Sequence, residues 1–323
     1  VEVTTFRGEG AYTDGRRPSA VTFHRDLVED LARRDFTVNA FAWDPIGEVF
    51  SDPFDGLADL KDGLIRAVGD PARRFGEDGL RTMRAVRLCA TRDLSLEHAT
   101  AAAIPGALDV LAKVSRERVH VELTKLLAAK VPTRGLVPMA ATQIWPLVLP
   151  MLAPAEHEAA LHAVDALPRD AVLRLARLLW PIAEAGDDAI VQGCLDGLRH
   201  GKAERTRLSA LLGPGTRALA NASDAIAIRR ACATIGRAYV EDALAILDPL
   251  LDRRDAIAAA LSGAALAQSE LAIKGRDLID EGIAQPGKQL GELLARLFEA
   301  TLVDPTTNDR DRLLALARGF SSG

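Results

Sequence analysis

Residues 74–87, which read RFGEDGLRTMRAVR, combine two acids with a regular series of arginines. Glu77 and Asp78 are followed by Arg81, Arg84 and Arg87 at a constant step of three residues. On a helix, residues three apart share a face, so Asp78 and Arg81 would lie side by side. An ionised aspartate only accepts hydrogen bonds and an arginine only donates them. The pair therefore offers an acceptor beside a donor.

This pair is complementary to the edges of two of the four nucleobases. Cytosine and adenine each carry an exocyclic amine beside an accepting ring nitrogen, whereas uracil and guanine present the opposite pattern. Asp78 and Arg81 would thus accept C and A without a template strand. In isolation, a helix-surface ion pair worth about 0.3–0.5 kcal/mol is the simpler interpretation. Arg87 lies about half a turn from Asp78 and would face a triphosphate or a neighbouring helix.

A second cluster lies in DLARRDFTVNAFAWD at 30–44, where Arg33 and Arg34 directly precede Asp35. Paired arginines suit a phosphate, because the guanidinium fork binds it with two hydrogen bonds. An adjacent aspartate can accept a hydrogen bond from a ribose hydroxyl. Taken alone, a charged helix end with a surface salt bridge is again the simpler interpretation.

The elements that must position these residues change character near residue 64. Strand patterns occur only before it, at 1–7, 19–24, 36–43 and 47–51, with one helix expected near 25–33. After it, helical periodicity dominates. The expected helices are 75–92, 97–103, 116–130, 155–166, 169–185, 187–199, 203–212, 223–247, 253–267 and 286–301. We therefore expect a mostly α protein with a small N-terminal α/β part.

The composition limits the possible functions. The 323 residues carry a net charge of −5, which excludes a globally basic nucleic-acid binder but allows a local basic patch. Cys89, Cys194 and Cys232 are odd in number and lie in apolar surroundings. They indicate buried thiols in a reducing compartment, so we expect a cytoplasmic protein. No charge-free run of about 18 apolar residues occurs, so no membrane span is expected.

Five motifs occur in one order along the chain: VEVTTFR, YTDGRRPSAVTF, LARRDFTVNAFAWD, DPFDGLADLKDGLIRAVGDPARRFGEDGLRTMRAVR and SRERVHVELTKLL. This series resembles the class II tRNA nucleotidyltransferases, the bacterial CCA-adding enzymes, with bacterial poly(A) polymerases as close relatives. The likeness is strong over residues 1–130 and weaker in the tail, where residues 270–298 read ELAIKGRDLIDEGIAQPGKQLGELLARLF. The joint match of five ordered motifs is far more specific than any one of them.

The resemblance implies template-independent addition of CMP and AMP, from CTP and ATP, to the 3′ end of tRNA. The reaction would use two metal ions, expected to be Mg²⁺. The resemblance also implies four parts, namely a partial nucleotidyltransferase head at 1–65, a helical neck with the nucleotide-reading motif at 66–131, a helical body at 132–262 and a helical, tRNA-binding tail at 263–323.

The resemblance further implies roles for single residues of the nucleotide pocket. Arg34 would contact the phosphates and Asp35 the ribose. Asp78 and Arg81 would read the base edge. The residues that complete the implied pocket are Arg84 and Arg87.

Residues outside the pocket also receive implied roles. The flexible loop YTDGRRP at 12–18 would help the switch from C to A addition through Asp14, Arg16 and Arg17. Glu2 matches a strand carboxylate proposed as an auxiliary acid beside the metal pair. In the tail, a Pro-Gly entry to a helix can bind a phosphate through free N–H groups. The tail cations expected to contact tRNA are Lys274, Arg276 and Lys288.

The sequence departs from the family pattern in two places. The family's metal-binding aspartates lie on an earlier strand, in Gly-Gly…Arg-Asp and Asp-x-Asp arrangements, and no such segment occurs here. Because the chain starts in mid-strand without Met, we expect that segment upstream and the chain as given to be inactive alone. Gly79 stands where the family usually has Pro or Ala. A glycine in a first helical turn costs about 1 kcal/mol and would loosen the frame under Asp78.

Two alternatives stay open. A poly(A) polymerase or an A-adding enzyme of the same family would use the same scaffold, whereas the loop at 12–18 disfavours an enzyme that adds only C. A non-catalytic RNA-binding relative is the alternative from another class. Nucleotide incorporation by the complete gene product separates an enzyme from such a relative.

Overall fold

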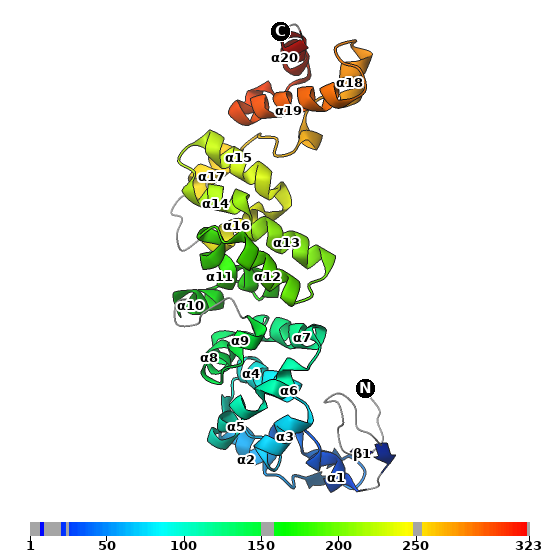
Figure 1. The fold of residues 1–323 in the computed structure, drawn as a ribbon, viewed down its shortest axis with the longest axis vertical. Helices are drawn as coiled ribbons and strands as arrows, with labels where there is room; N and C mark the ends of the chain where they lie inside the picture. The colour runs from blue at the N-terminus through cyan, green and yellow to red at the C-terminus, as the bar shows by residue number, and fades with distance from the viewer. Residues whose placement is uncertain (1–6, 10–20, 24–25, 150–157, 248–253, 322–323) are drawn as a thin grey trace. The chain divides into compact units, whose positions relative to one another are not determined.

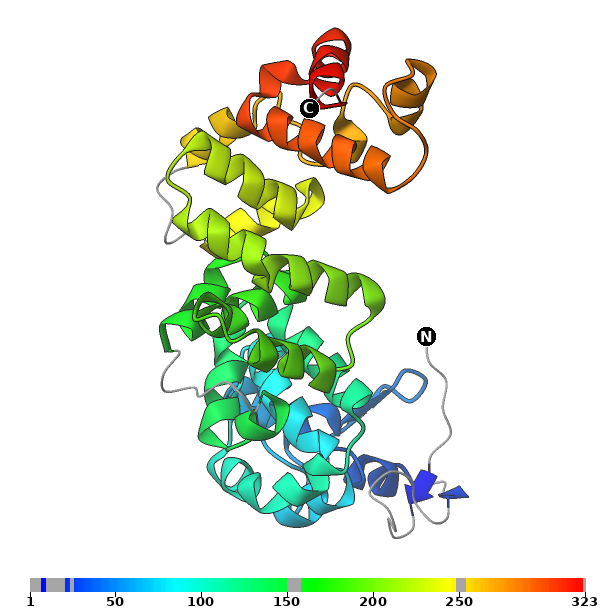
Figure 2. The same ribbon diagram turned by 45° about the horizontal axis from the view of Figure 1, so that its top comes forward.

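The computed structural model describes residues 7–9, 21–23, 26–149, 158–247 and 254–321, which fold into two compact units (Figures 1 and 2). The first unit comprises Val1–Ile182 and Ala189–Gly201. The second comprises Ala183–Asp188 and Lys202–Gly323.

The N-terminal part of the first unit contains the strands. They form three two-stranded sheets. The antiparallel pairs are β1 (Arg7–Glu9) with β2 (Val21–Phe23) and β3 (Ala42–Asp44) with β4 (Val49–Ser51), and the parallel pair is β5 (Leu64–Ile65) with β6 (Ser95–Leu96). The intervening helices are α1 (Leu27–Ala32), the 3-10 helix η1 (Thr37–Asn39) and α2 (Gly56–Lys61). A small core of Leu31, Ala40 and Val68 holds this part together.

The rest of the first unit is helical. Its elements are α3 (Pro71–Glu77), α4 (Leu80–Arg92), α5 (His98–Ala103), η2 (Pro105–Ala107), α6 (Leu108–Ala112), α7 (Arg116–Leu127), α8 (Thr133–Ala141), α9 (Trp145–Val148), α10 (Glu158–Ala166), α11 (Ala171–Glu184) and α12 (Asp188–Gly197). Helix α4 packs against both α7 and α8. Gly135 permits the close approach of α8, because a Cβ there would lie 2.6 Å from the Val86 carbonyl oxygen.

A buried arginine fixes α11 to the end of α7. The Arg174 side chain donates from Nη1 to the carbonyl oxygens of Leu127 and Ala129, at 2.6 and 2.5 Å, and from Nη2 to that of Leu167, at 2.9 Å. Carbonyls at a helix C-terminus have no partner within the helix. Arg174 therefore satisfies backbone groups that would otherwise be buried without a hydrogen bond.

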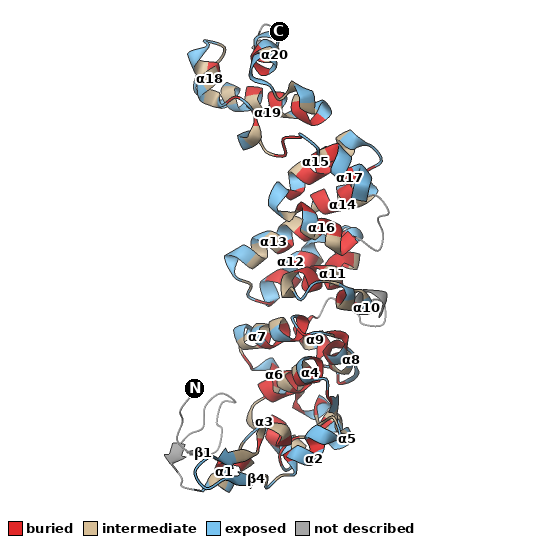
Figure 3. Ribbon diagram, turned by 180° about the vertical axis from the view of Figure 1, so that it is seen from behind, coloured by how far each residue is buried: buried red, intermediate tan, exposed pale blue. Residues whose placement is uncertain are grey.

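The second unit is helical throughout its described residues. Its elements are α13 (Lys202–Leu212), α14 (Pro214–Asn221), α15 (Ala225–Ile235), η4 (Arg237–Tyr239), α16 (Val240–Leu247), α17 (Arg254–Leu261), η6 (Gln268–Glu270), α18 (Gly275–Asp280), α19 (Lys288–Val303), η7 (Pro305–Thr307) and α20 (Arg310–Ser321). Buried residues recur along α15, among them Ile228, Cys232 and Ile235 (Figure 3). A separate core joins α18, α19 and α20 through Leu278, Leu293, Leu297 and Leu313.

These observations confirm the expected fold class, mostly α with a small N-terminal α/β part. The three cysteines are free and buried, as expected. Burial raises the pKa of the Cys89 thiol to about 12 and that of Cys232 to about 11. Within the described ranges, the chain has no helix with the length and apolar character needed to cross a membrane.

Several expected elements are wrong in part; the helix expected at 253–267, for example, ends at Leu261. The strand predicted at 36–43 contains an isolated bridge from Phe36 to Ala67, then η1, and only then β3. The 3-10 turn forms because the Ala40 N–H bonds back to the Thr37 carbonyl and the Thr37 hydroxyl bonds Asp59. The helix predicted at 223–247 is divided at Gly236, whose φ of +87° is outside the helical range.

The single helix predicted at 75–92 is also wrong, because Asp78 and Gly79 interrupt it between α3 and α4. Asp78 has extended backbone angles, with φ −148° and ψ 108°. A Cβ at Gly79 would lie 2.3 Å from the Leu111 nitrogen and 2.5 Å from the Val110 carbonyl carbon. Glycine therefore does not loosen the frame under Asp78, because its lack of a side chain lets the end of α6 pack directly on the break.

Candidate nucleotide-binding site

A pocket of about 550 Å³ lies in the first unit, where α1, η1, α4 and α7 meet. Seven arginines and two aspartates line it with Asn39 and two leucines. The lining includes all six residues that the sequence analysis assigned to a nucleotide, Arg34, Asp35, Asp78, Arg81, Arg84 and Arg87. The structure thus brings together residues from two motifs that are separated in sequence by more than 40 positions.

The two motifs are joined directly by Asp35 and Arg84. Asp35 is only 8% exposed. Its Oδ2 accepts a hydrogen bond from the Arg84 Nε at 2.7 Å, and its Oδ1 accepts from the Phe36 N–H and the Asn39 amide. The aspartate is therefore held at both oxygens, and α4 is tied to the segment that follows α1.

The electrostatics of this pair keep both groups charged. Burial alone raises the pKa of Asp35, but the Arg84 charge and the hydrogen bonds from Asn39, Arg84 and the Phe36 N–H outweigh it, so the net pKa is lowered. Burial lowers the pKa of Arg84, but Asp35 more than compensates, and the net pKa is raised. Each partner thus stabilises the ionised form of the other.

Arg81 lies deeper and is held by two segments, α3 and the end of α1. Its Nη1 donates to Glu77 Oε2 at 2.7 Å and to the Arg74 carbonyl at 2.9 Å, and its Nη2 donates to the Arg33 carbonyl at 3.1 Å. An arginine has five N–H donors. These bonds use three of the five donors. Among the described residues, about two N–H donors of Arg81 therefore remain available to a ligand.

Asp78 reaches the pocket from the break rather than from a helix turn. Its Oδ1 accepts from the Leu80 N–H at 3.0 Å, at the start of α4. Its Oδ2 accepts from Arg118 Nη2 at 2.9 Å. The acceptor and donor predicted for base recognition therefore line one pocket, although the helical geometry invoked for them was wrong.

Arg87 and Arg34 lie at the sides of the pocket. Arg87 faces α7, where its Nε forms an ion pair of 2.5 Å with Glu122. Two partners were expected for Arg87, a triphosphate or a neighbouring helix, and the structure shows the contact with the helix. Arg34 donates to the Asn39 carbonyl at 3.1 Å and lies 3.6 Å from Asp30. Its side chain is 43% exposed, which leaves it accessible to a ligand.

Sequence reasoning missed several residues in or around this site, among them Asn39 and Arg92, which line the pocket. Glu77 was visible beside Asp78, but its contacts to Arg74, Arg73 and Arg81 were not inferred. Arg118 and Glu122 lie in SRERVHVELTKLL, which was read only as part of the family series. Their spacing of four places them on one helical face, and that periodicity was the available signal.

The remaining candidates lie elsewhere. Glu2, Asp14, Arg16 and Arg17 are outside the described residues. The three tail cations belong to the second unit.

In the tail, the three cations differ in their contacts. The Lys274 Nζ donates to the carbonyls of Ser269 and Leu271, so it stabilises the chain before α18. Arg276 and Lys288 are 90% and 91% exposed and lie near acids on their own helices. Lys288 starts α19, directly after the Gly287 turn. The expected tRNA contact stays a prediction, with Arg276 and Lys288 as its better candidates.

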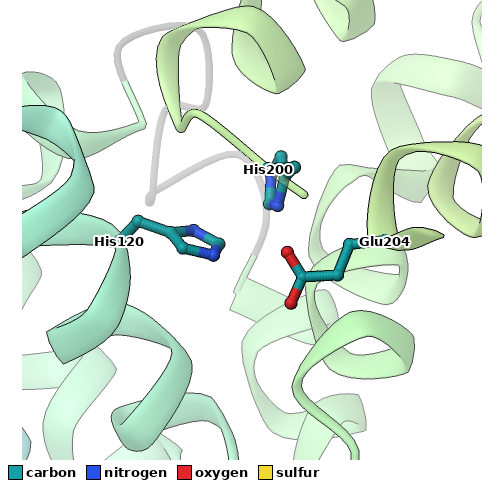
Figure 4. A group of neighbouring side chains, drawn as sticks. All are labelled: His120, His200 and Glu204. Carbon is teal, nitrogen blue, oxygen red and sulfur yellow. The ribbon is translucent and has the colours of Figure 1, made fainter. Parts of the chain in front are cut away.

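A further contact of α7 lies away from the pocket. The rings of His120 and His200 meet edge to face, with their centroids 4.7 Å apart (Figure 4). His120 precedes Glu122 by two residues, so it projects from another side of α7 than Arg118 and Glu122. This contact therefore involves another side of α7 than the contacts of Arg118 and Glu122.

Comparison with known families assigns three parts of the chain. The family described as Poly A polymerase head domain matches residues 1–66. The family described as probable RNA and SrmB-binding site of polymerase A matches 93–156, and the putative tRNA nucleotidyltransferase domain 2 matches 257–317. These matches assign the chain to a class, the nucleotidyltransferases related to poly(A) polymerase and tRNA nucleotidyltransferase, and an arginine-lined pocket is compatible with that class.

Curated relatives narrow this class. The CCA-adding enzyme of Levilactobacillus brevis is 35% identical over 317 residues, which cover 97% of this chain and 78% of that protein. That of Limosilactobacillus fermentum is 37% identical over 325 residues, covering 98% and 78%. The chain belongs to the family of CCA-adding enzymes.

Solved structures show the same fold. The crystal structure of the Bacillus stearothermophilus CCA-adding enzyme in complex with CTP matches with a TM-score of 0.70 and 27% identity, covering 99% of this chain and 78% of that one. The Thermotoga maritima CCA-adding enzyme complexed with tRNA matches with a TM-score of 0.63 and 20% identity, covering 91% and 74%. The second likeness supports the fold alone.

Proposed function

We propose that this chain selects CTP and ATP and presents them for addition to the 3′ end of tRNA. The observation that carries the proposal is the pocket itself, which gathers all six expected nucleotide residues in one cavity. Family membership supports the reaction, CCA addition or repair. The pocket supports the assignment of roles to residues.

The sugar and phosphates would be bound at the Asp35 side of the pocket. Asp35 remains ionised and keeps acceptor capacity, since a carboxylate has about four acceptor positions and three hydrogen-bonding groups contact it. It would accept a hydrogen bond from a ribose hydroxyl. Arg34 and Arg84, which are 43% and 36% exposed, would bind phosphate oxygens through charge-assisted hydrogen bonds.

The base would be read by Asp78 and Arg81. Asp78 would accept from the amine of C or A, and Arg81 would donate to the adjacent ring nitrogen. UTP would instead place a carbonyl oxygen against the carboxylate. An unpaired polar contact of that kind costs about 1–3 kcal/mol, which corresponds to about 5- to 160-fold discrimination.

The metal requirement of the proposal concerns residues outside this pocket. Among the described residues, no set of three neighbouring carboxylates could hold Mg²⁺. We therefore assign no reaction step to a metal ion bound by the described residues. The use of Mg²⁺ remains an expectation that follows from the family. The reaction would take place in the cytoplasm.

The base-reading assignment is tested by Asp78→Ala in the complete gene product. Steady-state kinetics with CTP, ATP, UTP and GTP, on tRNA lacking its 3′ CCA, should show lower use of CTP and ATP and a smaller gap to UTP. Asp109→Ala, which removes an exposed acid on α6, is the matched control and should change neither. Full retention of the preference for C and A in Asp78→Ala would contradict the base-reading role.

The same assay separates the remaining alternatives. A CCA-adding enzyme stops after one A on a tRNA that ends in CC. A poly(A) polymerase, which the head-domain match keeps open, would continue to add A. A non-catalytic RNA-binding relative would incorporate no nucleotide.

A further inference from the structure

Helix α7 supplies charged partners to two residues that line the pocket, Asp78 and Arg87. Arg118 and Glu122 lie one turn apart on the same face of α7. Arg118 bonds Asp78 at 2.9 Å, and Glu122 pairs with Arg87 at 2.5 Å. An acidic and a basic group of the pocket are thus each held by an opposite charge from a segment outside the nucleotide motifs.

The Arg118 contact determines how the Asp78 carboxylate is oriented. One oxygen is held by the Leu80 N–H and the other by Arg118. These two bonds fix the plane of the carboxylate, while about two of its four acceptor positions remain open. Arg118 is 38% exposed and Asp78 22%, so the pair contributes little to folding stability. Its main effect is on orientation.

We propose that Arg118 is a positioning residue for base selection. It aims the free acceptor positions of Asp78 at the exocyclic amine of C or A. The inference rests on the proposed base-reading role of Asp78. Without Arg118, the carboxylate keeps only the Leu80 bond and can rotate, so both the acceptance of C and A and the rejection of U weaken.

The test compares Arg118→Ala with the parent protein as complete gene products. We expect kcat/KM for CTP and ATP to fall about tenfold, since a misplacement of about 1 Å can cost up to about 100-fold. We expect UTP use to change much less, so the CTP/UTP ratio narrows. Arg118→Lys, which keeps a donor, should restore part of the ratio.

Two comparisons separate positioning from a general effect. Arg116→Ala removes another arginine of α7, one that bonds the Leu147 carbonyl, and should leave the CTP/UTP ratio unchanged. In an Asp78→Ala background, Arg118→Ala should have no further effect on that ratio, because its action passes through the missing carboxylate.

The outcomes are distinct for this inference and for the proposed function. If Asp78→Ala narrows the ratio but neither Arg118→Ala nor Arg118→Lys does, the inference about Arg118 is wrong and the base-reading role stands. If Arg118→Ala narrows the ratio equally with and without Asp78, Arg118 does not act through Asp78. If Asp78→Ala itself leaves the ratio unchanged, the base-reading role fails first.

Discussion

Replacing Arg84 with Met should destabilise the first unit by an amount that depends on pH. The substitution keeps an apolar stem of similar length but removes the charge opposite Asp35. Breaking a buried ion pair costs about 3–5 kcal/mol, whereas an exposed pair is worth about 0–1 kcal/mol. Asp35 is 8% exposed and the Arg84 side chain 36%, so water screens one partner. We therefore expect a loss of about 2 kcal/mol in the free energy of unfolding at pH 7.

The sign of the pH dependence follows from the two pKa shifts. In the parent protein the pKa of Asp35 is lowered, so its ionised form contributes stability above the unfolded value of about 4, and this contribution is lost as pH falls through the folded value. Without Arg84, burial is the largest remaining influence and raises the pKa, so the carboxylate is protonated on milder acidification. The destabilisation by Arg84→Met should therefore be largest near pH 7 and shrink toward pH 4.

Urea unfolding monitored by tryptophan fluorescence is a direct assay. The three tryptophans, Trp43, Trp145 and Trp180, all lie in the first unit, so fluorescence reports the unit that contains Arg84. Arg92→Met, at an exposed position two turns further along α4, is the matched control, with an expected change within about 0.5 kcal/mol. A loss in Arg84→Met that is constant over pH, or that grows in acid, would refute the coupling of Arg84 to Asp35.

Three further predictions concern the helical parts. Arg174→Met should destabilise the first unit by about 3–5 kcal/mol, because three buried carbonyls lose their donor; the same fluorescence transition measures this, and a loss below about 1 kcal/mol would contradict it. In the tail, Arg276→Ala and Lys288→Ala should each flatten the slope of log tRNA affinity against log salt by somewhat under one unit. An unchanged slope in both Arg276→Ala and Lys288→Ala would exclude these two residues from the tRNA path. Lys274→Ala should instead lower the melting temperature, measured by circular dichroism, because the Lys274 side chain donates to two backbone carbonyls.

The composition of the pocket could be predicted from the sequence because its residues lie in short, ordered motifs. Residue type and spacing singled out Arg34, Asp35, Asp78 and Arg81 as candidates, and the family resemblance implied their roles in a nucleotide pocket. The hydrogen-bond partners of these residues were not predicted. Contacts such as that of Arg84 with Asp35 join positions 49 residues apart and depend on how α4 packs. Local patterns show which groups are present, and packing determines which of them meet.

The two predicted helices that the structure divides, at 75–92 and 223–247, were wrong for related physical reasons. Periodicity continued through Gly79 and Gly236, because the flanking apolar residues kept a helical spacing on both sides. At Gly79 the close approach of the α6 end requires a residue without a side chain, and at Gly236 the backbone has a positive φ. Both requirements come from tertiary packing or from backbone angles that a hydrophobic pattern does not encode.

The carboxylate of Asp78 takes part in folding as well as in the pocket. It accepts from the first N–H of α4, a donor that has no partner inside the helix. A mutation at this position would therefore be selected against twice, once for the helix start and once for the base-reading role that we propose. Among natural variants of this protein, Asp78 should accordingly tolerate fewer replacements than the exposed arginines around it, and base preference should change only together with a new way of starting α4.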